Sequence, residues 1–206
     1  MQNYQKRILR QPFFLVLLLA MLTVVPVASF AQELAGAQRA SVVERISSAS
    51  SSVKALQCTF VQTKRSKVLK QPVVSEGVMA YRAPSYLRWE YTSPESVVIT
   101  VEGDSVSLIR KGVKADAATS RRISSLATTI LGCVSGTQVW DEKSFKVSIV
   151  EKADSYVVEL EPRRRGLKRM FQHIDLHFDK KSYAVRTVVL AEGSDASTTI
   201  KFTPVK

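Results

Sequence analysis

Apolar residues recur at two different spacings along the chain. Between residues 33 and 56 they follow one another at steps of three and four, which predicts an amphipathic helix with a serine-rich solvent face. From Gln57 onward the spacing falls to two, as expected of half-buried strands, and residues 87–92 show it most clearly. The other predicted strands are 58–64, 74–82, 96–102, 105–110, 145–149, 156–161, 174–178, 184–192 and 197–203.

Turn-forming residues separate these segments, as in Glu102-Gly103-Asp104. About ten or eleven short strands joined by tight turns predict an antiparallel meander that is curled rather than flat. A second amphipathic helix interrupts the meander and ends at Gly132, a suitable C-terminal cap. Its apolar face consists of Ile123, Leu126, Ala127, Ile130 and Leu131. We therefore predict an α+β fold, in which two helices cover the concave side of one strongly curved antiparallel sheet.

The first 31 residues have the features of a cleavable secretory signal. Three basic residues precede the apolar run 13–27, and Ser29-Phe30-Ala31 places small residues at the two positions that a signal peptidase reads. No cysteine follows the expected cleavage point until Cys58, so a lipid-modified N-terminus is not expected. We predict a signal peptide over residues 1–31 and a single exported domain over 32–206.

The basic excess belongs to the predicted mature domain. Removal of residues 1–31 leaves 27 of the 30 Lys and Arg residues and all 18 Asp and Glu residues, a net charge of +9. Such a charge favours contact with lipid headgroups or acidic proteins, although solubility alone also explains it. No nucleic-acid motif is present, and we expect a monomer with no nucleic-acid partner.

Two cysteines, Cys58 and Cys133, would meet an oxidising compartment after export. A disulfide between them would close a loop of about 75 residues and stabilise the fold by about 4–5 kcal/mol. The alternative is that both are buried thiols that act as small apolar side chains.

The sequence gives little support for catalysis or metal binding. It contains no Gly-x-Ser-x-Gly motif, and its two histidines fall on one predicted strand. The row His173, Asp175, His177 and Asp179 could converge on a cation, but it alternates with apolar residues and is better explained as the solvent face of that strand. We predict no enzyme, no metal and no cofactor.

A basic segment lies between two predicted strands. Five positive charges fall within seven residues, on Arg163, Arg164, Arg165, Lys168 and Arg169. The segment is either a solvated hairpin tip or a contact site for an anionic membrane or an acidic partner.

An ordered set of residues within 56–101 resembles the bacterial outer-membrane lipoprotein carrier proteins, the LolA type. The set is Leu56…Phe60-x-Gln62-x-Lys64, Leu69-x-x-Pro72-x-x-Ser75-x-Gly77-x-x-x-Tyr81-x-x-Pro84-x-x-Leu87-x-Trp89-x-Tyr91-x-x-Pro94. The likeness continues through Phe171-x-x-Ile174-x-Leu176-x-Phe178 to Thr199-Ile200-x-Phe202.

The resemblance implies a half-open β-barrel whose helices form a lid over an apolar cavity. It also implies a periplasmic carrier in a Gram-negative bacterium, which moves acylated lipoproteins from an inner-membrane ABC transporter to an outer-membrane receptor without a cofactor. Cavity residues would include Phe60, Tyr81, Leu87, Trp89 and Tyr91. Lid residues would be Ile123, Leu126, Ile130 and Leu131. We further expect a Cys58–Cys133 bridge to limit lid opening.

The chain departs from such carriers at one position of consequence. Carriers usually have an Arg directly before the Pro that opens the Trp strand, where it helps to hold the lid shut; here Ala83 takes that place and Arg82 comes one residue earlier. Shorter relatives are associated with glycolipid or polyene-lipid cargo. The hypotheses are therefore a carrier of lipoproteins, a carrier of another lipid, or a scaffold that senses a lipid or protein signal without transport.

Overall fold

We describe the fold from a computed structural model of the chain, in which residues 32–116, 132, 139–193 and 195–205 are described. Residues Ala31–Lys206 form one compact unit. The predicted helix around 123–131 and Cys133 lie outside the described residues.

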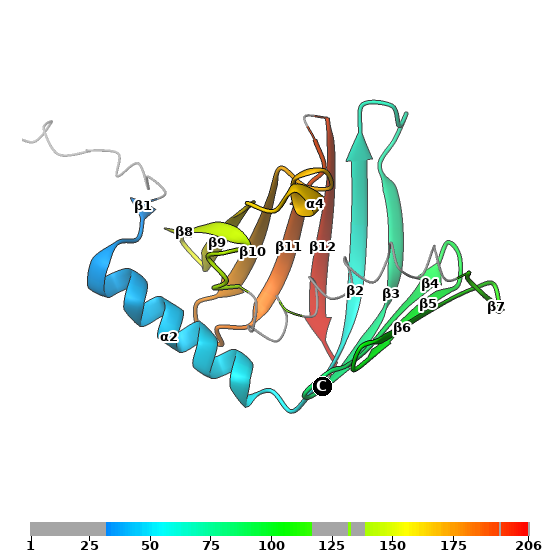
Figure 1. The fold of residues 1–206 in the computed structure, drawn as a ribbon. Coiled ribbons are helices and arrows are strands. Elements are labelled where there is room, and N and C mark those ends of the chain that lie inside the picture. The colour runs from blue at the N-terminus through cyan, green and yellow to red at the C-terminus, as the bar shows by residue number, and fades with distance from the viewer. Residues whose placement is uncertain (1–31, 117–131, 133–138, 194, 206) are drawn as a thin grey trace, which may run out of the picture. The chain divides into compact units, whose positions relative to one another are not determined.

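The described strands form one antiparallel sheet of twelve (Figure 1). Its order is β1-β8-β9-β10-β11-β12-β2-β3-β4-β5-β6-β7, with β1 at one edge and β7 at the other, so the sheet is open. The strands are β1 (Gln32–Glu33), β2 (Ala55–Ser66), β3 (Val73–Arg82), β4 (Tyr86–Ser93), β5 (Val97–Glu102), β6 (Ser105–Arg110), β7 (Val113–Lys114), β8 (Phe145–Glu151), β9 (Ser155–Pro162), β10 (His173–Asp179), β11 (Val185–Ala191) and β12 (Ala196–Pro204). The predicted curved antiparallel sheet is confirmed.

The last strand of the chain pairs with an early strand in the middle of this sheet. The last strand, β12, pairs with β2 over nine residues, from Ala196 opposite Ser66 to Pro204 opposite Cys58. This pairing joins two meanders, β8 to β12 and β2 to β7. In Figure 1 the strands β4 to β6 turn away from β8 to β11, which gives the sheet its bend.

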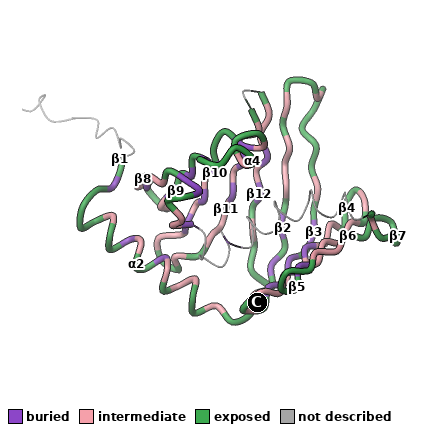
Figure 2. Tube along the Cα trace, viewed as in Figure 1, coloured by how far each residue is buried: buried purple, intermediate pink, exposed green. Residues whose placement is uncertain are grey.

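Cross-strand register places one continuous apolar set on one face of the sheet, because residues directly opposite each other in paired strands point to the same side. One row runs through Leu108, Ile99, Trp89, Met79, Cys58 and Pro204. Another runs through Gln62, Ile200, Val188, Leu176, Val158 and Ile149. Most of these residues are buried, and we call this side the inner face (Figure 2).

The helix α2 (Gly36–Ser52) lies against the inner face. Its side chains Val42 and Ile46 are buried in the same core as the sheet residues. The helix is shorter than the predicted 33–56 at both ends. Gln32 and Glu33 pair with β8, and Leu56 already belongs to the inward-facing positions of β2. The apolar spacing of the helix and that of the following strand therefore overlap in the sequence.

Candidate binding cavity

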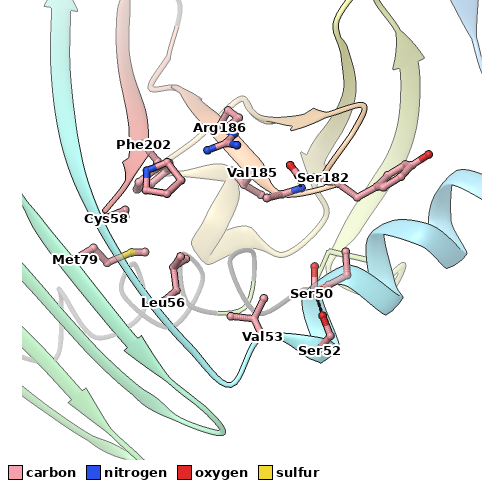
Figure 3. Close-up of a pocket in the computed structure, with 14 residues that line it drawn as sticks. Ser50, Ser52, Val53, Leu56, Cys58, Met79, Ser182, Val185, Arg186 and Phe202 are labelled. Carbon is pink, nitrogen blue, oxygen red and sulfur yellow. Dashed lines mark hydrogen bonds between the residues drawn. The ribbon is translucent and has the colours of Figure 1, made fainter. Parts of the chain in front are cut away.

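A cavity of about 270 Å³ lies between the C-terminal end of α2 and the inner face (Figure 3). Its apolar wall comes from four strands and the helix end, and its polar edge from the β10–β11 turn and the serines of α2. The lining residues are Ala49, Ser50, Ser52, Val53, Leu56, Cys58, Met79, Ser182, Tyr183, Ala184, Val185, Arg186, Phe202 and Pro204.

The wall is chemically inert and water-poor. Cys58 is a free thiol that is only 2% exposed, and burial raises its pKa from 9.0 to about 11. It faces Met79 across β2 and β3, so two sulfur-bearing side chains lie together on this wall. The expected Cys58–Cys133 bridge stays a prediction, because Cys133 lies outside the described residues.

The β10–β11 turn forms the opposite side of the cavity and is fixed by its own hydrogen bonds. Asp179 Oδ1 accepts bonds from the amides of Lys181 (3.1 Å) and Ser182 (2.8 Å) and from the Ser182 hydroxyl (2.8 Å). These bonds, those from Ser182 first, lower the pKa of Asp179. Tyr183 follows with φ +54°, a left-handed conformation that aims the backbone back toward β11.

Tyr183 connects this turn to α2. The Arg45 guanidinium donates a hydrogen bond of 2.9 Å to the Tyr183 hydroxyl and lies 5.8 Å from the ring centroid. The Tyr183 ring stacks on Tyr156 with centroids 6.1 Å apart. Lys180 lies 5.3 Å from the centroid of Tyr156 and pairs with Glu151 at 2.6 Å. This chain of contacts, the Arg45–Tyr183 clasp, holds the helix against the cavity mouth.

The five expected cavity residues of the early strands lie together, but in the packed core. Phe60, Tyr81, Leu87 and Trp89 are buried and Tyr91 is half-buried, and none of them lines the described cavity. Their role in ligand binding stays a prediction.

Aromatic packing fills this part of the inner face. The Phe60 ring lies 4.3 Å from Trp89 and 5.2 Å from Tyr91, and Trp89 lies 5.8 Å from Phe202. Phe60 also sits above Gly77, where an added Cβ would come within 2.5 Å of its Cζ atom. Glycine is therefore required opposite this ring.

One polar group is embedded in the cluster. The Tyr91 hydroxyl donates to Gln62 Oε1 at 3.0 Å, and burial raises the pKa of Tyr91, with the Trp89 and Gln62 side chains acting against that rise. Trp89 Nε1 is buried and has no hydrogen bond of regular geometry to any described residue.

The basic segment 163–169 forms an exposed turn between β9 and β10. It contains the one-turn helix α4 (Arg165–Lys168), whose Leu167 packs against the core while the charged side chains stay exposed. Arg164 pairs with Asp141 at 3.8 Å, and no other cation of the segment has an ion pair with a described residue. The hairpin predicted here is thus a helical turn anchored by Leu167.

The polar row of β10 lies on the outer face, as its alternation predicts. Ile174, Leu176 and Phe178 are buried on the inner side. Burial raises the pKa of Asp175 and lowers that of His177. Within the described ranges, no three carboxylate, imidazole or thiol groups are placed to hold a metal ion.

The cavity residues that sequence reasoning missed come from segments distant in the chain. Val53 and Leu56 fall within the predicted helix 33–56 and Val185 within the predicted strand 184–192, whereas Tyr183 falls in no predicted element. Only the β12–β2 pairing and the turn geometry bring these segments together. No spacing in the sequence signals that proximity.

One protein family model matches the chain. The profile described as "Outer membrane lipoprotein carrier protein LolA" matches residues 51–206. No curated protein matches the chain. In the part of the chain that the structure describes, no helix is long and apolar enough to cross a bilayer.

Solved structures that resemble the chain have low identity. A LolA superfamily protein from Nitrosomonas europaea shows 8% identity and a TM-score of 0.43, covering 80% of this chain and 90% of that one. MucB in the Pseudomonas aeruginosa MucA/MucB complex shows 15% identity and 0.44, covering 79% and 54%. Mycobacterium tuberculosis lipoprotein LppX shows 12% identity and 0.39, covering 81% and 96%.

Proposed function

The chain belongs to the outer membrane lipoprotein carrier protein LolA family, and we propose that it shields the acyl chains of lipoproteins in the apolar cavity and carries them from the inner to the outer membrane. The observation that supports this most is the cavity itself, about 270 Å³ with a wall of aliphatic, aromatic and sulfur-bearing side chains. Nothing in the proposal requires a cofactor or a chemical step.

The physical need for such a carrier follows from the hydrophobic effect. Transfer of an acyl chain of about 16 carbons into water costs roughly 12 kcal/mol of free energy, at about 0.8 kcal/mol per methylene. A carrier must hide the chain and still release it. The exposed Arg45–Tyr183 contact at the cavity mouth is weak enough to open and release a chain, while the buried Val42 and Ile46 keep α2 on the sheet.

The route has two membrane ends. We propose that residues 1–31 direct export to the periplasm of a Gram-negative bacterium. An inner-membrane ABC transporter would then load the cargo and an outer-membrane receptor would accept it. The exposed cations of the 163–169 turn are suited to docking at anionic headgroups, since each basic residue near such a surface contributes about 1 kcal/mol.

Docking by the turn can be measured on vesicles. The triple substitution Arg163→Ser, Arg164→Ser, Arg165→Ser should weaken binding to anionic vesicles by up to about a hundredfold at low salt, on that headgroup contribution. The control substitutes Arg65, Lys67 and Lys70 by Ser and removes the same net charge from the exposed β2–β3 end. Equal binding by both variants would contradict the docking role.

The carrier role is tested by filling the cavity. Ala49 lines the cavity, whereas its neighbour Ser48 is exposed on the same helix. Ala49→Trp should abolish binding of a fluorescent acyl chain, and Ser48→Trp should leave it unchanged. Native mass spectrometry of the protein from its own periplasm identifies the cargo: acylated peptide supports the proposal, and a bound protein with no lipid contradicts it.

A further inference from the structure

Arg186 lies at an irregularity of the sheet, on the cavity side of β11. Thr187 of β11 pairs with His177 of β10, and Val185 pairs with the next residue, Phe178. Arg186 is therefore the extra residue of a β-bulge, and its alternation with the buried Val188 and Leu190 places it on the inner face. It lines the cavity beside Val185 and Phe202 (Figure 3).

No described residue neutralises the charge of Arg186 by a direct contact. Its guanidinium makes no hydrogen bond or ion pair with any residue in the described part of the chain. Asp179, the carboxylate whose pKa it helps to lower, directs Oδ1 to the backbone and hydroxyl of its own turn. The other cations around the mouth are engaged, Arg45 with Tyr183 and Lys180 with Glu151.

A cation at the cavity that pairs with no described residue can bind an anionic group of a ligand. A guanidinium presents a planar fork of donors that fits a carboxylate or a phosphate. Ser50 lines the same cavity, and its hydroxyl has no hydrogen-bond partner among the described residues. Polar groups placed in this way orient a ligand whose remaining surface is apolar.

The size of the cavity limits the number of chains. At about 270 Å³ it falls just below the roughly 300–1,000 Å³ of pockets that enclose drug-sized ligands. The space therefore suits one hydrocarbon chain rather than several packed together.

We infer that the cavity binds a single-chain anionic amphiphile, with its acyl chain against Leu56, Cys58 and Met79 and its charged head at Arg186. The head is a carboxylate or a phosphate, as in a fatty acid or a lysophospholipid. This inference rests on the proposed acyl-chain carrier function, and for this cavity it favours a single-chain lipid over a lipoprotein as the ligand.

The test is a titration with three ligands of equal chain length, each below its micelle concentration. These are palmitate, palmitoyl lysophosphatidylglycerol and uncharged hexadecanol, at pH 8. Arg186→Gln should weaken binding of at least one charged ligand by tenfold or more, the cost of losing a charge-assisted hydrogen bond, and leave hexadecanol unchanged. The charged ligand that loses more identifies the head group.

Two further variants make the result specific. Arg186→Lys should retain most of the affinity for the charged ligand, and Arg65→Gln, which removes an exposed charge outside the cavity, should change nothing. Equal weakening of all three ligands by Arg186→Gln, or no weakening of either charged ligand, overturns the inference. If the native protein binds hexadecanol with the same affinity as the charged ligands, the carrier proposal stands and the inference fails. If it binds none of the three, the carrier proposal fails too.

Discussion

Two neighbouring regions of the inner face use apolar residues in opposite ways. Around Phe60 the rings of Trp89 and Tyr91 and the close approach of Gly77 make a tightly packed cluster, whereas one row further along the strands Leu56, Cys58 and Met79 border a cavity. Both regions belong to the same strands and face the same side. One difference is side-chain volume: large rings pack over Gly77, whereas Leu56, Cys58 and Met79 carry smaller side chains.

This contrast separates two requirements of a carrier. The aromatic region supplies rigidity, since edge-to-face rings are both apolar and directional. The cavity region supplies empty space for a ligand, and the well-packed aromatic region beside it keeps that space from collapsing. The predictions below break one region at a time.

The largest effect should come from opening the packed region. Phe60→Ala should lower the free energy of unfolding by about 3–5 kcal/mol, as for other buried aromatic residues. Leu56→Ala, on the cavity wall, should cost only about 1–2 kcal/mol, because one side of Leu56 already faces empty space. Urea unfolding of both variants measures the two losses in unfolding free energy. Equal losses would contradict the difference in packing between the two regions.

Overfilling the packed region should come next. Gly77→Ala places a methyl group against Phe60 and the Glu90 carbonyl, and should cost about 3 kcal/mol, the upper end of typical overpacking. Gly166→Ala is the matched control, because an added Cβ there meets nothing within 4 Å. A Gly77→Ala protein as stable as the Gly166→Ala protein would show that Phe60 does not press on this glycine.

The cavity wall should protect its thiol. With the pKa of Cys58 raised from 9.0 to about 11, the thiolate fraction at pH 8 falls by about a hundredfold. In a Cys133→Ser background, iodoacetamide should therefore react about a hundredfold more slowly with the folded than with the unfolded chain. The rate should keep rising as the pH approaches 11, and an acyl ligand should lower it further. A rate that levels off near pH 9 would contradict a water-poor wall.

The smallest effect should follow from loosening the clasp. Tyr183→Phe keeps the ring on Tyr156 but removes the hydrogen bond from Arg45. Release of a bound chain should become a few-fold faster, with little change in thermal stability, since exposed contacts contribute weakly. Tyr156→Phe is the control, because its hydroxyl has no hydrogen bond to a described residue. Stopped-flow dilution compares the two release rates.

The sheet could be predicted from the sequence because the alternation of apolar and polar residues identifies both the strands and the face of each strand that is buried. The predicted segments 74–82 and 105–110 differ by at most one residue from β3 and β6. The helix limits could not be predicted as closely, since the apolar position of Leu56 fits either a helical stripe or a strand. The helical turn α4 could not be predicted either, because one apolar residue, Leu167, among five charged ones gives no clear sign that it packs against the core.

The cavity could not be predicted, for a physical reason. Hydrophobic pattern says which residues leave water but not whether the space they enclose is filled. Phe60 and Met79 both face inward, yet only Met79 lines the cavity. The β-bulge that lets the adjacent residues Val185 and Arg186 both line the cavity is likewise a matter of register, which single residues do not reveal.

The most direct test of the account is photo-crosslinking with a palmitoyl chain that carries a diazirine at its far end. The account predicts that the label, mapped by mass spectrometry, falls on the cavity wall at residues such as Leu56, Met79, Val185 and Phe202. Labelling of the packed aromatic region around Trp89 instead, or of the outer face of the sheet, would contradict it.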